Sequence, residues 1–185
     1  AGIVLSEYYL QTREKWVIPE LQEVYDFLIQ SQYVDLIQLN PKSHETHPHA
    51  VPKTPLDSHG GWGHNPGFEG YGPISMLTAQ GALVFGLMKR CGLNVDRERH
   101  DAAYAFLRRA SGDNFYVWYE DQAAGPKDWA DMGRTGTAAI AFHMNPWEGE
   151  HQEISLNYAE LIGNQPESFP DTHGSPVMGM AYGAL

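Results

Sequence analysis

The sequence has a single cysteine and no long apolar run. One thiol, Cys91, excludes a disulfide within the chain and any zinc site built on several cysteines. Because Cys91 lies at the end of an apolar segment, we predict that it is buried. No stretch reaches the roughly 18 consecutive apolar residues that a membrane-spanning helix needs. The best candidate, residues 74–88, is interrupted by Ser75, Thr78 and further polar residues, so no membrane span is predicted.

Basic residues are also few. Lysine and arginine number 12 against 23 aspartates and glutamates, which gives a formal net charge of −11. Binding to nucleic-acid phosphates requires clustered positive charge. The adjacent basic pairs are Lys89-Arg90 and Arg108-Arg109, and both lie where a helix is predicted to end. The composition therefore argues against a nucleic-acid partner.

The most informative pattern is a block that occurs three times. In each copy, a loop rich in glycine, aromatic and charged residues leads directly into a helix of small and apolar residues. The loops begin at His59, Trp129 and Asp171, and the helices begin near Pro73, Thr135 and Val177. Repetition of one supersecondary unit predicts a repetitive all-helical fold.

Two kinds of predicted helix alternate along the chain. The helices that follow the loops are apolar or small on all sides, whereas the helices between them carry one apolar stripe, such as Val17, Leu21, Val24 and Leu28. A helix that is apolar all round is buried on all sides, and a helix with one stripe covers it. The alternation predicts helical hairpins in which inner helices are wrapped by outer helices. An open solenoid of hairpins is the alternative to a closed ring.

The predicted domain covers residues 1–185, with long loops at about 32–72 and 112–132. The helices at 1–10 and 174–185 share the small, uncharged character of the inner type. Because the chain begins and ends within these predicted helices, we expect it to be a piece of a longer protein. No signal-peptide pattern occurs in these residues, and the localisation stays open, an extracytoplasmic one included. The inner-helix residues predicted to be nearly inaccessible are Ala79, Ala82, Leu83, Gly86, Ala138, Ala139 and Ala141.

The turn Gly60-Gly61-Trp62-Gly63, placed before an inner helix, resembles the Gly-Gly-aromatic-Gly turns of α/α-toroid proteins. That group includes terpenoid cyclases, protein prenyltransferase β-subunits and lanthionine cyclases. The runs 59–144 and 173–179 are similar to an uncharacterised bacterial family of toroid domains of unknown function. The resemblance implies an α/α toroid, here an incomplete ring, and it implies no activity. The run 128–131 does not match the Asp-x-Asp-Asp motif of squalene-type cyclases, and Cys91 alone cannot supply the zinc ligands of the other two groups.

In such a ring, every loop from an outer to an inner helix emerges on the same rim, where binding and catalytic residues concentrate. The candidate catalytic residues in these loops are His64, Glu69, Tyr71, Asp131, Arg134 and His173. The candidate substrate-binding residues are Trp62, Trp118, Tyr119, Glu120 and Trp129. Helix N-termini, together with Arg134 and His173, favour an anionic or hydroxyl-rich ligand. As alternatives, Trp62 can plug a hairpin, and the acidic residues and His173 can cap helices.

Three histidines, His44, His47 and His49, have a spacing that resembles a metal cluster. Lys42 and Pro48 place them in a stretch predicted to be a solvated loop, whereas metal sites need partners that orient the ligands. We therefore predict no cofactor, and a metal at these histidines is the less favoured alternative.

Three functions fit these observations. The leading one is a hydrolase or lyase acting on a carbohydrate or another polyhydroxylated or anionic substrate, with aromatic platforms and a pair of carboxylates as acid and base. The second is a non-catalytic binding or scaffolding domain that holds a peptide or another domain of the parent chain. The third is a terpenoid cyclase-like or transferase-like enzyme with an apolar cavity. The lining of the cavity distinguishes them, because paired carboxylates favour the first and an apolar aromatic lining favours the third.

Overall fold

The computed structural model describes residues 1–34, 59–64, 72–119, 132–147, 149–169 and 176–185. Within these ranges, regular structure is helical apart from one antiparallel bridge between Ser111 and Val117. In chain order, the α-helices are α1 (Gly2–Thr12), α2 (Val17–Ser31), α5 (Ser75–Arg90), α6 (Arg97–Ala110), α7 (Met132–His143), α8 (His151–Gly163) and α9 (Pro176–Ala184). A short 3-10 helix spans Pro166–Ser168. The predicted all-helical fold is confirmed.

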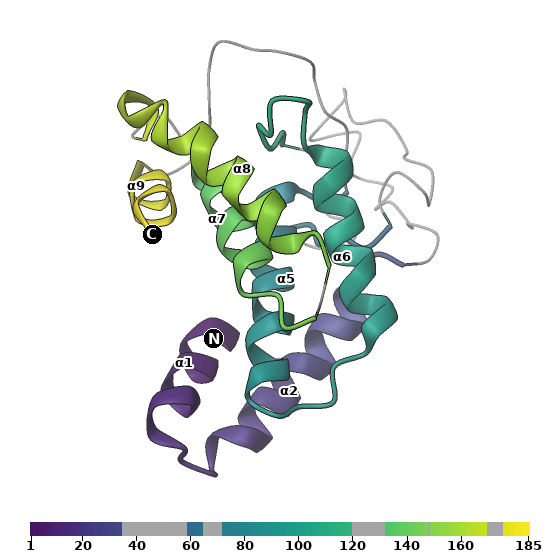
Figure 1. Ribbon diagram of the computed structural model, residues 1–185. Coiled ribbons are helices and arrows are strands. Elements are labelled where there is room, and N and C mark those ends of the chain that lie inside the picture. Colours follow the sequence, from purple (N-terminus) through teal and green to yellow (C-terminus); the bar gives the residue numbers. More distant parts are fainter. Residues whose placement is uncertain (35–58, 65–71, 120–131, 148, 170–175) are drawn as a thin grey trace.

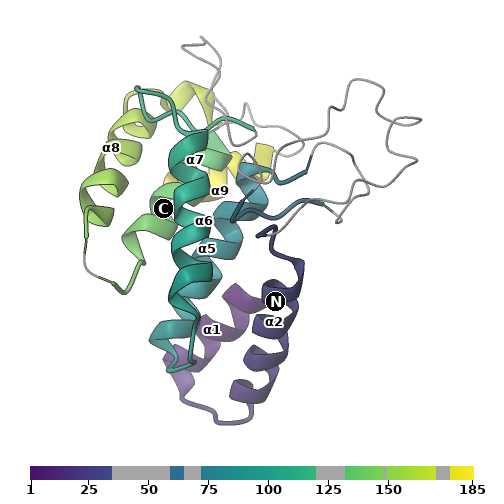
Figure 2. The same ribbon diagram turned by 90° about the vertical axis from the view of Figure 1, so that its right-hand side faces the viewer.

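The helices form two rows (Figure 1). Helix α5 contacts α1 and α7, and α7 contacts α5 and α9, so these four helices make one row, which we call the inner row. Helix α2 packs on α1, α6 on α5 and α8 on α7, and these three make the outer row. Figure 2 shows the same pairing from the side, with α6 and α8 covering α5 and α7. Consecutive helices therefore pair as hairpins, as the alternating pattern predicts.

Burial follows the two predicted helix types. Helix α5 and helix α7 are buried on most sides, whereas α2 buries the narrow stripe Val17, Leu21 and Tyr25. All seven inner-helix residues predicted to be inaccessible are buried, and the thiol of Cys91 is buried as well. Helix α6 is capped by Asp96, whose carboxylate accepts hydrogen bonds from the backbone N–H groups of Glu98 and Arg99.

Glycines permit the close packing of the inner row. A Cβ atom on Gly136 of α7 would overlap the backbone carbonyl of Tyr182 in α9. A Cβ atom on Gly81 of α5 would come within 2.7 Å of the Trp62 ring. At these two positions, the neighbouring element occupies the space that any side chain would need. The small residues therefore set how closely α9 and Trp62 approach the inner helices.

The two end helices of the inner row are less buried than α5 and α7. Helix α1 buries Gly2 and Ser6, and it exposes 69% of Val4. Helix α9 exposes 71% of Val177 and 54% of Met180. Both helices thus take places in the inner row through their contacts with α5 and α7, while their other sides stay exposed.

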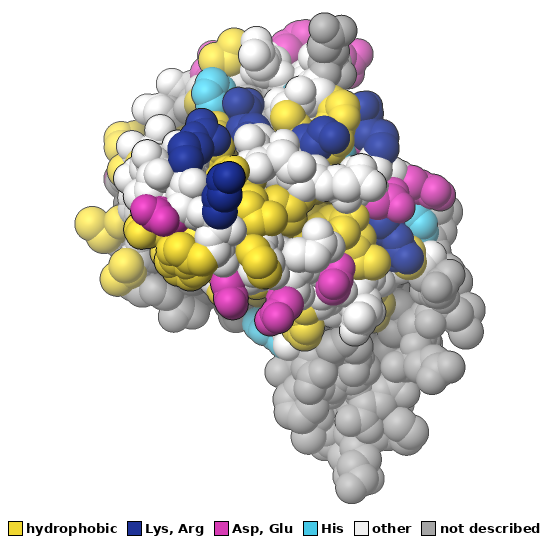
Figure 3. Space-filling view, turned by 90° about the horizontal axis from the view of Figure 1, so that it is seen from below, with side chains coloured by type: hydrophobic (Ala, Val, Ile, Leu, Met, Phe, Trp, Pro, Cys, Tyr) yellow, Lys and Arg dark blue, Asp and Glu magenta, His cyan; other side chains and the backbone are white. Residues whose placement is uncertain are grey.

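The end of the molecule with the α1–α2 and α5–α6 turns carries charges of both signs (Figures 1 and 3). On this face, lysine and arginine side chains lie together with aspartates and glutamates around apolar side chains. Arg97 and Asp101 of α6 form an ion pair at 2.7 Å. This face therefore has no extended positive surface of the kind that binds phosphate backbones. Among the helices described, none has the length and apolar character to cross a membrane.

Replacing Gly136 with alanine should destabilise the fold, because the new methyl group must push α9 away from α7. Overpacking of this kind costs about 1–3 kcal/mol. The matched control is Gly163→Ala at the end of α8, where a Cβ would have no atom within 4 Å. Urea unfolding should show a lower free energy for Gly136→Ala and an equal or higher one for Gly163→Ala. Equal stability of the two variants would show that α7 and α9 are not in close contact.

Candidate functional site

The segments that precede α5 and α7 have the same local structure. The backbone N–H of Trp62 donates to Thr78 Oγ1 at 3.1 Å, and that of Val117 donates to Thr135 Oγ1 at 3.2 Å. Both threonines are the fourth residue of their helix, and both are fully buried. Two residues before each donor, the backbone has a positive φ, at Gly60 and Phe115. The segments 60–62 and 115–117 thus contact the helices α5 and α7 in the same way, while the sequence repeats that begin at Trp129 and Asp171 lie in part outside the described residues.

The two junctions lie side by side. The backbone N–H of Ser75, the first residue of α5, donates to the carbonyl of Tyr119 at 2.8 Å. The end of each preceding outer helix also pairs with its junction, since Tyr33 N–H donates to Gly61 O at 2.9 Å and Gly112 N–H donates to Tyr116 O at 3.0 Å. We call the segments 59–64, 72–74 and 111–119 the rim. These contacts place the segment 111–119 beside the start of α5, and the expectation that the loops entering the inner helices meet at one rim stays a prediction.

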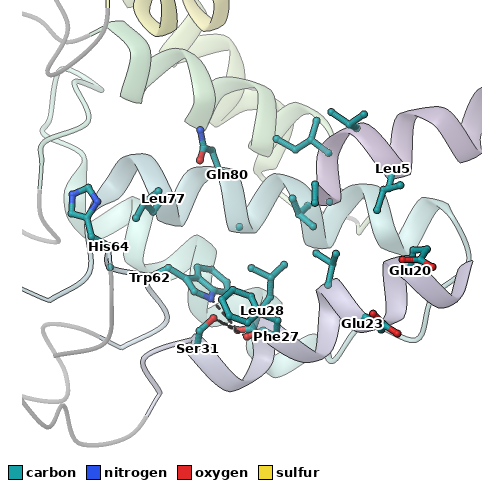
Figure 4. A pocket seen from close by; sticks show the side chains of 18 of the residues that line it. Leu5, Glu20, Glu23, Phe27, Leu28, Ser31, Trp62, His64, Leu77 and Gln80 are labelled. Atoms are coloured by element: carbon teal, nitrogen blue, oxygen red, sulfur yellow. Dashed lines mark hydrogen bonds between the residues drawn. The ribbon is translucent and has the colours of Figure 1, made fainter. Parts of the chain in front are cut away.

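A groove with a volume of about 1070 Å³ lies beside the rim (Figure 4). Its walls come from α1, α2 and α5, and Tyr182 of α9 also faces it. Residues of α1, α5 and α9, three helices of the inner row, thus line one space. The apolar lining includes Val4, Leu5, Val24, Phe27, Leu28, Trp62, Leu77 and Val84.

Polar side chains lie at both ends of the groove. At the rim end, His64 and Gln80 lie near Leu77 (Figure 4), and the Gln80 amide donates to the Tyr182 hydroxyl at 3.4 Å. At the opposite end, Glu20 and Glu23 of α2 line the groove (Figure 4). The groove therefore suits a ligand with an apolar body and polar ends.

Trp62 forms part of the groove wall and also ties elements together. Its side chain is 5% exposed, and its indole N–H donates to the carbonyl of Leu28 at 2.9 Å. Its ring packs edge-on against Phe85 at 5.3 Å and fills the space that Gly81 leaves open. These contacts match the alternative that Trp62 fills the interior of the hairpin. Most of its ring is buried, and only a small part of it can contact a ligand in the groove.

Arg134 lies inside the rim rather than in the groove. It is 2% exposed, and its guanidinium donates to Val117 O at 3.1 Å and to the Tyr116 hydroxyl at 3.0 Å. The guanidinium carbon also lies 6.0 Å from the centre of the Trp118 ring and 5.6 Å from that of Tyr119. These cation–π contacts make Arg134 the centre of an aromatic cluster that holds the second junction.

The other candidates lie outside the described residues, and their sharing of one concavity with His64 stays a prediction. They are Glu69, Tyr71, Glu120, Trp129, Asp131 and His173, together with the histidines at 44, 47 and 49. In the ranges that the structure does describe, no three His, Cys, Asp or Glu side chains are grouped to hold a metal ion.

Sequence reasoning missed the part of the groove that α1 and α2 supply, because it looked for the site in the loops. A signal was present in α2. Phe27 is a large apolar residue outside the buried stripe, and it follows Glu20 and Glu23 at helical spacing on the same side. In the structure, Phe27 joins Val4 as an exposed apolar side chain of one groove, and contiguous exposed apolar surface marks interaction sites.

A second cluster joins α6 to α8 and to the turn between α7 and α8. The fully buried ring of His100 lies 4.0 Å from that of Trp147 and 4.4 Å from that of Tyr104. Burial lowers the pKa of His100 to about 4, against the opposing effect of Asp101, whose carboxylate lies 2.9 Å from Nδ1. Burial also lowers the pKa of His151, which packs near Tyr104. These imidazoles are therefore neutral packing groups near neutral pH.

The described helices place this protein in the class of helical proteins in which an inner row of helices is covered by an outer row. The chain belongs to a family described as a domain of unknown function (DUF6288), whose sequence profile matches residues 1–184. No curated protein and no solved structure matches the chain.

The folded domain should lose stability as the pH falls from about 6.5 toward 4. His100 binds a proton near its ordinary pKa in the unfolded chain, whereas the folded state resists protonation until about pH 4. The folded-state pKa is depressed, so the stabilisation is present above pH 6.5 and decreases below it, by up to about 3 kcal/mol. Denaturant unfolding at pH 7, 5.5 and 4.5 measures this loss.

In His100→Gln, the decrease over that pH range should be smaller, while some of it remains because of His151. The control is His143→Gln at the exposed end of α7, which should keep the wild-type pH dependence. An unchanged pH dependence in His100→Gln would contradict the assignment.

Proposed function

We propose that this domain binds an elongated amphipathic ligand in the groove on the concave side of an α/α-toroid array. The placement of the two ends of the inner row supports the toroid arrangement. Helix α1 and Tyr182 of α9 stand at opposite ends of that row and line the same groove, as they would in a curved row. Curvature of this kind comes from a rotation between successive hairpins. Inner helices that are buried all round, with a covering helix on each of α1, α5 and α7, support it further.

The observation that carries the binding function is the groove itself. Its volume of about 1070 Å³ lies just above the range of about 300–1,000 Å³ that small-molecule sites occupy. Large apolar side chains line it at exposed positions, with Val4 at 69% and Phe27 at 67% exposed. Covering such surface with a ligand contributes about 25 cal/mol per Å² of apolar area. The hydrogen-bonding groups of His64, Gln80 and Tyr182 then orient the polar end of the ligand.

Binding is favoured over hydrolysis because of where the described carboxylates lie. Glu20 and Glu23 line the end of the groove that is remote from the rim, and both are exposed (Figure 4). A glycosidase needs two carboxyl groups that flank the bond it cleaves, whereas Glu20 and Glu23 lie together on one helix at one end of the groove.

A second candidate is an enzyme acting on a polyhydroxylated or anionic substrate at the rim. The observation that favours it is the hydrogen bond between Ser75 and Tyr119, which sets two loop-to-helix junctions beside each other. In that case Glu69, Asp131 and His173 would supply acid–base groups next to His64. Incubation with neutral oligosaccharides and with uronate oligomers, followed by mass spectrometry, should show products that an Asp131→Asn variant fails to form. The absence of turnover with both substrate classes would leave the binding function.

The apolar lining is also what a terpenoid cyclase-like or transferase-like enzyme requires. Isoprenoid diphosphates have an apolar body that suits this lining, and their anionic end would have to lie at the rim end, away from Glu20 and Glu23. Their conversion to a cyclised or transferred product, detected by gas chromatography, would favour that third function over simple binding.

The groove should bind N-phenyl-1-naphthylamine, a neutral apolar probe whose fluorescence rises in an apolar site. Phe27→Asp should weaken that binding about fivefold or more, because loss of about 1 kcal/mol of apolar contact corresponds to that factor. Phe27 is largely exposed, so the variant should keep its fold. A fluorescence titration measures the dissociation constant.

The matched control is Leu156→Asp on α8, since Leu156 is 69% exposed and does not line the groove. This variant should bind the probe as the wild type does. If Leu156→Asp weakens binding as much as Phe27→Asp does, or if neither has an effect, the probe does not occupy the groove.

A further inference from the structure

The groove has an acidic end that nothing in the described structure neutralises. Glu20 and Glu23 lie three residues apart on α2, which places them on the same side of the helix. Both are exposed, and within the described ranges neither has an ion-pair partner. No lysine or arginine lines the groove. An occupant that brings positive charge to this end is therefore complementary to it.

The apolar surface continues beyond the floor of the groove onto its edges. Val4 of α1 and Phe27 of α2 line the groove and are largely exposed, while Leu28 and Val84 lie deeper within it. The groove thus has exposed apolar side chains at its edges and buried or half-buried ones in its floor. This arrangement fits a cylindrical apolar body better than a flat ring.

A helix is the peptide conformation that these walls accept. In the described part of the groove, the walls are the sides of helices apart from residues 62–64, and no strand lines it that could pair with an extended chain. An extended peptide would leave its backbone groups unpaired against apolar side chains, whereas a helix satisfies its own. A cylinder of about 10 Å diameter fills 1070 Å³ over roughly 14 Å, which corresponds to between two and three helical turns.

We propose that the occupant of the groove is an amphipathic helix of a partner protein. Its apolar stripe contacts Val4, Phe27 and Val84, and its lysine or arginine side chains pair with Glu20 and Glu23. This proposal rests on the proposed binding function and names the partner of the same site.

Two designed 14-residue peptides test the proposal by fluorescence anisotropy. Both carry leucines at i, i+3, i+4 and i+7, and one has lysines beside the stripe where the other has glutamates. The wild type should bind the lysine peptide and not the glutamate peptide. A lysine peptide of the same composition with scrambled leucines should bind at least fivefold more weakly, because it presents no stripe.

Charge reversal at the groove locates the interaction. The double variant Glu20→Lys/Glu23→Lys should bind the lysine peptide about tenfold more weakly, since each exposed pair is worth a factor of a few. It should also gain binding of the glutamate peptide. The control is Glu153→Lys/Glu160→Lys, which makes the same change of net charge at exposed positions of α8 and should bind as the wild type does.

Several outcomes would overturn the proposal. Equal weakening by the two double variants would show an effect of overall charge, and equal binding of the scrambled peptide would show that no helical stripe is recognised. If the naphthylamine probe still reports the groove through Phe27 while no peptide binds, the partner helix is wrong and the binding function stands. Displacement of the probe by dodecyltrimethylammonium, with no peptide binding, would replace the helix with a small cationic amphiphile.

Discussion

Burial of α5 and α7 on nearly all sides is the constraint on which the rest of this structure depends. A helix without a solvent face must satisfy its polar groups internally and must leave room for its neighbours. The hydroxyl of Thr78 donates to the carbonyl of Ile74, and that of Thr137 donates to Gly133, so both are satisfied within their own helices. Gly81 and Gly136 leave the room. Larger residues at these two positions would separate the elements that define the groove.

The same constraint fixes the rim. Thr78 and Thr135 are buried, and the hydroxyl oxygen of each accepts a hydrogen bond from a backbone N–H of the rim. These bonds hold the rim segments in one register over α5 and α7. The rim is therefore a rigid edge in the described residues, with Arg134 packed beneath its aromatic rings. Rigid edges of this kind are suited to hold long loops in place, and loops held in this way are where specificity concentrates.

The groove arises where the inner row is incompletely covered. Helix α1 approaches α5 closely at Gly2, where a Cβ would come within 2.6 Å of Val84, and α2 packs mainly on α1. This leaves the apolar sides of three helices facing one space, with Glu20 and Glu23 at one end and His64 and Gln80 at the other. Apolar walls supply the affinity for a ligand, and the different polar groups at the two ends select its direction.

The sequence by itself determined the helical class, the alternation of inner and outer helices and the buried alanines, because these follow from local hydrophobic periodicity. It also pointed to Trp62 and Arg134 as members of the junctions. Only the tertiary structure decided that Arg134 is enclosed by Tyr116, Trp118 and Tyr119, because a cation beside aromatic residues has the same local pattern whether it faces a ligand or a ring. It also decided that Phe27 and Glu20 of α2 share a groove with Tyr182 of α9, since that depends on how helices far apart in the chain pack on one another.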